Sequence, residues 1–316
     1  EASELDTHGL RGGEAELIEA VPMAPRVEPP VLRFWREFRE SPVAVVGLAV
    51  FVVVALAAIF APWITPQNPY DLRQLSILDG RLPPLSQSMD GMTYWLGTDD
   101  QGRDMLSAII YGLRISLGIG AMSTVIAIVI GGSLGLIAAF YGGRLESLIM
   151  RVVDLQLSFP AILVALILLA VLGRGVDKVL IALIIVQWAY YARTIRSQAL
   201  VERRKEYIEA ARCLALSDGR ILFRHLLPNC LPPVIVVGTV QVANAIALEA
   251  TLSFLGVGVP ITEPSLGLLI SNGYGYMLSG DYWISFFPGI ALLVAIVSIN
   301  LVGDQLRDVL NPRLRR

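Results

Sequence analysis

The side chains that most often carry out chemistry are few in this sequence and widely scattered. Two histidines, His8 and His225, and two cysteines, Cys213 and Cys230, occur in 316 residues. The histidines fall in different segments, so the sequence predicts no histidine-based metal site. The two thiols are expected to be small packing residues, and no Ser/His/Asp or Cys/His arrangement for nucleophilic catalysis stands out. The sequence predicts a protein that is not an enzyme and holds no cofactor or metal of its own.

Polar side chains inside an apolar stretch are more informative. Gln241, Asn244 and Glu249 lie within residues 231–255, and at about 100° per residue they share one side of a helix. Such groups are costly to place in lipid unless they face protein or water. One interpretation is that this side lines a translocation path, where Glu249 meets an amine or a cation. The alternative is that these residues pair with a neighbouring helix or reach the membrane interface.

Composition places these residues in a membrane protein. Hydrophobic residues make up 55% of the chain and charged residues 16%, with a mean hydropathy of +0.64, whereas soluble domains are about a quarter charged. An apolar run of about 20 residues crosses the hydrocarbon core as a helix. We expect an all-α integral membrane fold with six spans, and Pro160 is expected to kink the third. The predicted spans are 42–63, 115–140, 148–172, 178–199, 231–255 and 284–303.

Lysine and arginine indicate the orientation of these spans. If the N-terminus is cytoplasmic, the external segments are 64–114, 256–283 and the short link between the third and fourth spans. They contain few basic residues, namely Arg73, Arg81, Arg103, Arg114, Arg174 and Lys178. The positive-inside rule therefore predicts cytoplasmic segments at 1–41, 200–230 and 304–316. Within the second span, Gly131 and Gly135 are four residues apart, a spacing that favours close packing against another helix.

Two segments outside the spans are open to more than one interpretation. Residues 1–30 lack any hydrophobic period and predict a disordered tail. Residues 31–40, VLRFWREFRE, are either a short amphipathic helix at the membrane surface or a positively charged flank of the first span. The Asp residues between 90 and 104 predict solvated turns, and the alternative is a site for a divalent ion.

The segment 200–230 predicts a helix, a turn and a second helix outside the membrane. Strong helix formers run from Glu206 to Leu216. Ser217 and Asp218 then provide an N-cap for a helix that is expected to stop at Pro228. Such a construction offers a surface on which another protein can sit, and the alternative is a helix lying on lipid. The candidate docking residues are Glu206, Tyr207, Glu209, Ala210, Ala211, Leu214, Ala215, Ser217 and Asp218.

This segment resembles the EAA loop of ABC importer permeases, in which Glu-Ala-Ala precedes a Gly and a closing hydrophobic-x-Leu-Pro. The matching residues are Glu209, Ala210 and Ala211, then Ala215 where the family usually has Gly, and His225 to Pro228 at the close. Alanine is the smallest change from glycine, so docking is expected to survive. His225 also departs from the family pattern, at its hydrophobic position.

Four further stretches resemble the second, or C-type, permease chain of dipeptide, oligopeptide, nickel and glutathione importers. They are LGTDDQGRDMLSAIIYGLRISL at 96–117, FYGGRLESLIMRVVDLQLSFP at 140–160, LSFLGVGV at 252–259 and NLVGDQLRDVLNPR at 300–313. With the EAA loop they occur in the family's order from about residue 34 to the end. The resemblance implies a type I importer permease that forms half of a path in the bacterial inner membrane.

The resemblance also implies partners. They are a homologous second permease, two cytoplasmic ATPases that each take one EAA loop into a groove, and a periplasmic or lipid-anchored substrate-binding protein. The sequence lacks the Gly-x-x-x-x-Gly-Lys-Ser/Thr loop that cradles phosphates, so ATP and Mg²⁺ are expected on the ATPases. Besides membrane lipid, no other partner is implied, and nucleic acid is not expected.

The cargo stays open between dipeptide, oligopeptide, nickel chelate, glutathione and an opine-like compound. Two other classes of protein are alternatives. A secondary transporter would carry inverted repeats or paired interrupted helices, and no half-to-half symmetry is evident. An intramembrane enzyme would need paired carboxylates or a nucleophile within the spans, whereas Glu249 stands alone there.

Overall fold

The computed structural model describes residues 29–88 and 91–310. The chain forms two units, Glu1–Glu37 and Phe38–Arg316. Helix α1 (Pro30–Arg39) occupies the stretch 31–40, for which a short helix is one of two interpretations, and the Arg33 Nε donates to the Glu37 carboxylate over 2.8 Å. The predictions for the tail 1–28 and for residues 311–316 lie outside the described residues.

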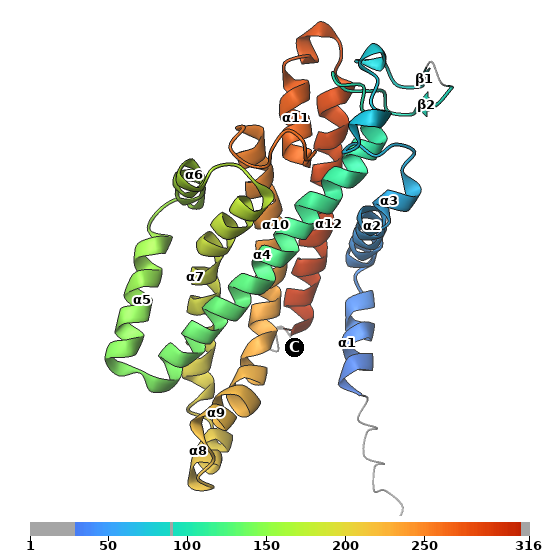
Figure 1. Ribbon diagram of the computed structural model, residues 1–316. Coiled ribbons are helices and arrows are strands. Elements are labelled where there is room, and N and C mark those ends of the chain that lie inside the picture. Colours follow the sequence, from blue (N-terminus) through green and yellow to red (C-terminus); the bar gives the residue numbers. More distant parts are fainter. Residues whose placement is uncertain (1–28, 89–90, 311–316) are drawn as a thin grey trace, which may run out of the picture. The chain divides into compact units, whose positions relative to one another are not determined.

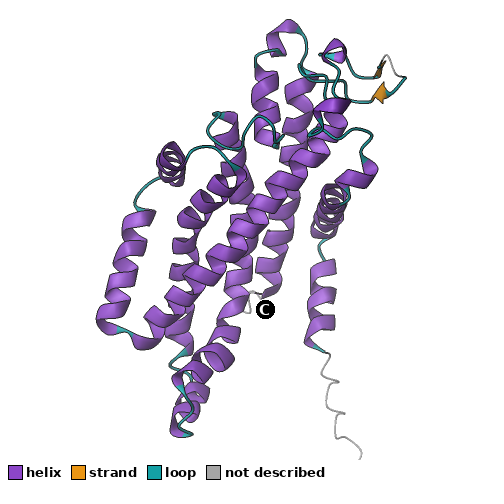
Figure 2. Cartoon of the chain, viewed as in Figure 1, coloured by secondary structure: helices purple, strands orange, loops and turns teal. Residues whose placement is uncertain are grey.

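Long apolar helices dominate the second unit (Figures 1 and 2). Among the described residues, five helices are long and apolar enough to cross a membrane, or six spans if one bent pair counts as one. The single helices are α2 (Pro42–Ile59), α4 (Met105–Tyr141), α7 (Val176–Glu202), α10 (Leu227–Phe254) and α12 (Trp283–Leu310). Several of them extend beyond the apolar runs, since polar turns at the ends of a span continue the same backbone hydrogen bonding.

The third predicted span, 148–172, is bent at Pro160, where the sequence predicts a kink, and the helix is interrupted there. Helix α5 (Gly143–Leu157) and helix α6 (Ala161–Leu172) meet at an angle of 91°. Pro160 stands at the N-cap of α6. Because proline lacks a backbone donor and disfavours helical geometry in the residue before it, the chain leaves the helix at this point.

Glycine permits a close contact between α4 and α7. A Cβ atom on Gly131 would lie 2.0 Å from the Trp188 carbonyl oxygen, and one on Gly135 would lie 2.3 Å from the Ala192 carbonyl oxygen. The prediction that these small residues pack against another helix is confirmed. Helix α10 in turn packs against α4, α7 and α12, and α2 packs against α12.

The two ends of this helical unit differ in construction. At one end the chain forms α8 (Glu206–Cys213), α9 (Asp218–Arg220) and the π-helical turn η4 (Ile221–Leu226). We call this the α8 end. At the other, the α11 end, lie α3 (Ala61–Ile64), η2 (Leu72–Gln74), η3 (Ile77–Asp79) and the hairpin of β1 (Ser86–Gln87) and β2 (Thr93–Tyr94) (Figure 1). The loop predicted at 256–283 contributes α11 (Leu266–Tyr274) and η5 (Met277–Ser279) there.

A buried ion pair builds the start of α4, and the prediction of solvated turns is wrong for Asp99 and Asp104, whereas Asp90 lies outside the described residues. Asp99 and Arg103 are 1% and 2% exposed, and the Arg103 Nε donates to Asp99 over 2.6 Å. Asp104, also buried, caps α4 by accepting a hydrogen bond from the Ser107 amide. These carboxylates bind protein donors, and no group of three or more candidate metal ligands occurs among the described residues.

Candidate functional site

Helix α8 is attached to the helical unit through one apolar face. Ile208 and Ala211 are 1% and 4% exposed and pack in a core cluster with Tyr191, Ile195 and Leu226. The apolar residues of α8 therefore point toward α7 and η4, and this burial fixes how α8 is rotated about its axis.

The opposite side of α8 and its following turn are open to solvent. Exposed residues there are Glu206, Glu209, Ala210, Leu214, Ala215, Ser217 and Asp218, and we call this set the α8 surface. Leu214 is 74% exposed, which is unusual for a large apolar side chain beside acidic residues. Of the other two candidate docking residues, Ala211 is buried and Tyr207 is partly buried, so their side chains face the protein's own interior.

Ala215 has a backbone conformation that normally selects glycine. Its φ angle is +52°. The Ala215 amide donates to the Arg212 carbonyl over 2.9 Å, and the Leu216 amide donates to the Ala211 carbonyl over 3.2 Å. These two bonds form a Schellman motif, in which the left-handed residue costs less as glycine. The departure from the EAA pattern thus falls on the residue where a Cβ atom strains the backbone.

A polar network connects α8 to the helices on either side of it. The buried Glu202 carboxylate, at the end of α7, accepts hydrogen bonds from Lys205 Nζ (2.7 Å) and the Tyr207 hydroxyl (2.8 Å). Asn229 of α10 donates to the same Tyr207 oxygen over 3.2 Å. Burial, and the Glu202 carboxylate beside it, raise the pKa of Tyr207 to about 12. The hydroxyl consequently stays protonated and donates at neutral pH.

The end of α4 is also joined to this region. The Arg212 guanidinium lies over the Phe140 ring, 5.7 Å from its centroid, within cation–π range. Arg203 donates to the Ala139 carbonyl. Helix α8 is therefore held by α4, α7 and α10 together, so a force applied to α8 acts on three of the long helices.

The second helix of the segment does not stop at Pro228, which corrects the prediction. Ser217 occupies the N-cap position of α9, and its side chain makes no capping bond to any described residue. The chain then continues through η4 directly into α10. In the π-helical turn the Leu227 amide bonds to the Leu222 carbonyl, five residues back. This shift of the bonding pattern accommodates Pro228, which has no donor to offer.

Glu249 is enclosed within the protein. It is 0% exposed, and its carboxylate accepts hydrogen bonds from Ser116 of α4 (2.8 Å) and Ser253 (2.7 Å). Ser265, the N-cap of α11, also hydrogen-bonds to it. The carboxylate therefore joins α4, α10 and α11, which favours the interpretation that Glu249 pairs with neighbouring helices.

Gln241 and Asn244 do not join Glu249. The Asn244 amide donates to the Gln241 side chain over 2.7 Å, with Gln241 buried and Asn244 exposed. A separate polar contact between α4 and α7 was not predicted from sequence. There Thr124 donates to Gln187 over 3.1 Å, and Gln187 donates to Ser123 over 3.2 Å.

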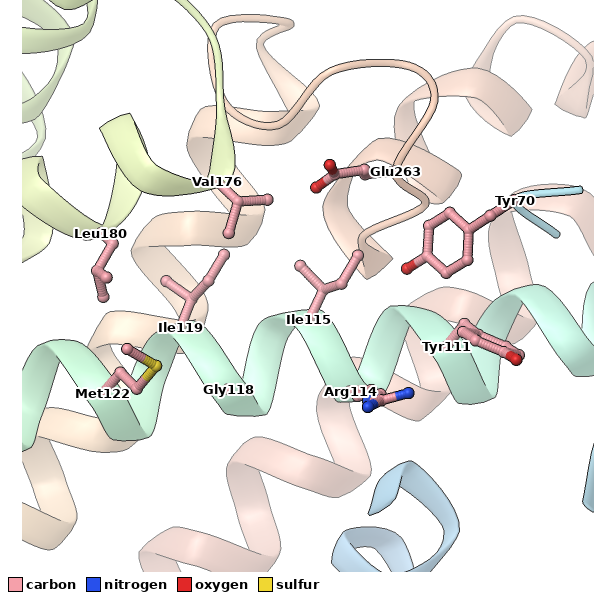
Figure 3. Close-up of a pocket in the computed structure, with 10 residues that line it drawn as sticks. All are labelled: Tyr70, Tyr111, Arg114, Ile115, Gly118, Ile119, Met122, Val176, Leu180 and Glu263. Atoms are coloured by element: carbon pink, nitrogen blue, oxygen red, sulfur yellow. The ribbon is translucent and has the colours of Figure 1, made fainter. Parts of the chain in front are cut away.

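A pocket of about 430 Å³ opens beside α4 toward the α11 end (Figure 3). Its charged and aromatic lining consists of Arg114, Glu263, Tyr70 and Tyr111, and its apolar lining includes Met122. Burial, followed by the charge of Glu263, raises the pKa of Tyr70 well above its ordinary value. Sequence analysis did not select these residues. The one available signal is Arg114, a charge at the edge of an apolar run.

Comparison with known proteins identifies the family. Residues 131–316 match the family described as binding-protein-dependent transport system inner membrane component, and residues 30–84 match the N-terminal TM domain of oligopeptide transport permease C. The first match covers more than half of the chain. The chain belongs to this family of membrane permeases.

The permease is similar to curated relatives along most of its length. The dipeptide transport system permease protein DppC of Escherichia coli (strain K12) is 40% identical over 304 residues, which cover 96% of this chain and 98% of the relative. The di/tripeptide transport system permease protein DppC of Pseudomonas aeruginosa (strain UCBPP-PA14) is 37% identical over 287 residues, covering 90% and 93%.

The fold of the permease agrees with a solved structure. An inward-facing structure of the MetNI methionine ABC transporter matches with a TM-score of 0.53 and 21% identity, covering 65% of this chain and 97% of that chain. At this identity the likeness shows the fold alone, that of a type I importer permease. The permease is thus a multi-pass membrane subunit of an ABC importer, and its relatives are named as transport permeases rather than as enzymes.

Proposed function

We propose that this permease forms half of the path by which an ATP-driven importer carries small peptides across the bacterial inner membrane. The observation that carries the peptide assignment is the similarity to dipeptide and di/tripeptide permeases over at least 90% of both chains. The substrate-binding protein delivers the peptide on the periplasmic side, where the α11 end would lie.

The α8 surface is the proposed docking site for a cytoplasmic ATPase. It projects from the helical unit (Figure 1), and it combines three exposed acids, Glu206, Glu209 and Asp218, with the exposed Leu214. Exposed acids of this kind offer complementary charge to a partner, and Leu214 offers an apolar contact beside them. The basic residues of 200–230 support a cytoplasmic position for this end.

The remaining partners follow from the same assignment. A homologous permease would supply the other half of the path. Helix α4 leaves Met122, Val125 and Val129 exposed, and such a stripe needs lipid or a second permease to cover it. ATP and Mg²⁺ would bind to the two ATPase subunits, whose closure would push on α8 and, through it, on α4, α7 and α10.

Co-purification tests the docking proposal. In the detergent-solubilised complex, Glu209→Lys combined with Leu214→Asp should release the ATPases, because both changes lie on the α8 surface and neither touches the core. We expect retention of the ATPases to fall at least about tenfold, the loss of roughly 1.4 kcal/mol or more of binding energy.

The matched control is Asp308→Lys, a charge reversal at an exposed residue near the end of α12, which finishes at the α8 end of the unit (Figure 1). It should leave the ATPases bound. Equal retention in all three proteins would show that the α8 surface is not the docking site. Peptide uptake by the wild-type complex in proteoliposomes tests the cargo separately.

A further inference from the structure

The pocket beside α4 has the dimensions of a small-molecule site. Its volume of about 430 Å³ falls within the range of roughly 300–1,000 Å³ that ligand pockets occupy. The pocket lies between α4, the start of α7, the loop before α11 and the segment that holds Tyr70 (Figure 3). Arg114, Gly118 and Met122 are exposed along α4, so the pocket is accessible from one side.

The pocket holds two charged side chains of opposite sign. Arg114 comes from α4, and Glu263 comes from the loop between α10 and α11. Neither belongs to an ion pair with another described residue. Each interacts electrostatically with the Tyr70 side chain, so Tyr70 lies near both charges. A cation and an anion in one small pocket suit a ligand that carries both charges itself.

The rest of the lining is aromatic at the charged end and aliphatic beyond it. The Tyr70 and Tyr111 rings meet edge to face, with centroids 5.2 Å apart, and aromatic faces also attract an ammonium group. Ile119, Met122 and Leu180 line the other part (Figure 3). An apolar side group attached to the charged ligand would be removed from water there.

We propose that this pocket is a recognition site on the translocation path for a zwitterionic solute with an apolar side group, namely a small peptide with free termini. Arg114 binds the carboxylate and Glu263 binds the ammonium group. The proposal rests on the proposed function, since it places the peptide at a defined position in this chain. It makes Arg114 and Glu263 residues that determine specificity for free termini.

Photolabelling of the assembled complex tests the site directly. The probe is a dipeptide with a diazirine-bearing apolar side chain, applied without the binding protein, whose own selectivity would otherwise mask that of the pocket. We expect peptide mapping to find the label between Ile115 and Met122. A free dipeptide should compete with the probe, and the same dipeptide with an acetylated N-terminus and an amidated C-terminus should not.

Charge-neutralising variants then assign the roles. Arg114→Gln and Glu263→Gln should each weaken labelling about tenfold, the effect of losing one charge-assisted hydrogen bond. Arg114→Lys should restore part of it. The matched control is Arg174→Gln, an exposed arginine between α6 and α7 that does not line the pocket, and it should label like the wild type.

The outcomes separate this proposal from the proposed function. If the wild-type complex imports the peptide while the label misses the pocket, or persists in both variants, the recognition site is wrong and the function stands. If peptide is not imported at all, both fail. Phosphatidylethanolamine is a second zwitterion that meets the protein in the membrane. The labelling is therefore repeated in nanodiscs with and without this lipid. Displacement by that lipid but not by free dipeptide would assign the pocket to a headgroup and overturn the proposal.

Discussion

Ala215 carries a measurable strain in the turn that follows α8. The left-handed conformation costs alanine about 1–2 kcal/mol. Ala215→Gly removes this strain, but the larger conformational entropy of glycine in the unfolded chain offsets part of the gain, so the turn should be stabilised by about 0.5–1 kcal/mol. Slower hydrogen exchange of the Leu216 amide, which closes the turn on the Ala211 carbonyl, is the expected result.

Ala210→Gly serves as the control for that exchange experiment. Ala210 is exposed within the helical part of α8, where glycine costs about 1 kcal/mol, so exchange should become faster. Faster exchange in Ala215→Gly as well would contradict the claim that alanine strains the backbone at position 215.

The cap of α4 should make stability depend on pH. Burial raises the pKa of both Asp100 and Asp104 above the ordinary value of about 4. The folded protein therefore binds these protons more tightly than the unfolded chain does. The resulting stabilisation is complete below the ordinary pKa and is lost as the pH rises through the raised pKa, with a slope of at most about 1.4 kcal/mol per pH unit for each group.

Asp104→Asn isolates one of the two groups, since asparagine is as good an N-cap as aspartate and does not titrate. Thermal unfolding of the solubilised protein between about pH 4 and 7 should show a flatter dependence in this variant. An unchanged slope would contradict the assignment to Asp104.

The contact between α4 and α7 depends on glycine at the level of whole helices. Gly131→Ala should cost about 3 kcal/mol or more, because its Cβ atom would overlap the Trp188 carbonyl unless the two helices move apart. Gly118→Ala, on the same helix, meets nothing within 4 Å and should be neutral or slightly stabilising. Thermal unfolding of the two variants should give a lower melting temperature for Gly131→Ala than for Gly118→Ala. Equal melting temperatures would contradict the close contact.

Helix α8 also shows how a short helix between two long apolar helices is oriented by what it buries. Ala210 and Ala211 are neighbours in the sequence and equally suited to a helix, yet one is exposed and the other packs in the core. Ala211 is the buried one because it lies three residues after Ile208, on the same face of the helix. For the same reason a bulky residue at 211 would disrupt the fold, whereas one at 210 would test docking.

For the molecule as a whole, Tyr207 is expected to couple the ATPase to transport. Tyr207→Phe removes the hydroxyl that joins Glu202 of α7 to Asn229 of α10 and leaves the α8 surface intact. ATPase binding should persist, while peptide import per ATP hydrolysed falls about tenfold, corresponding to one hydrogen bond to a charged group. Parallel uptake and ATPase assays in proteoliposomes measure this ratio.

The exposed Tyr141, at the end of α4, supplies the matched control. Tyr141→Phe should leave import per ATP at the wild-type value. Loss of ATPase binding in Tyr207→Phe would show instead that the residue acts in docking, and an unchanged ratio would show that this network does not transmit the motion.

The sequence by itself determined that the chain spans a membrane, roughly where each span lies, and that a helical segment separates two of the long apolar helices near Glu209. Those features depend on local free energies: the transfer of about 20 consecutive side chains into lipid, helix propensity, and the missing donor of proline. The position of the break at Pro160 follows from local rules, but its right angle does not. The passage of the helix through Pro228 was also beyond local rules, since a π-helical turn accommodates that proline.

Only the tertiary structure decided which polar residues meet. It pairs Asp99 with Arg103 in the interior, encloses Glu249 with hydroxyls from three helices, and brings Arg114 and Glu263 to one pocket across a long separation in sequence. A charge in a sequence shows only that a partner or water is needed. Which partner it finds is set by the packing of helices, and the close approach of α4 to α7 at Gly131 is one of the contacts that fix this packing.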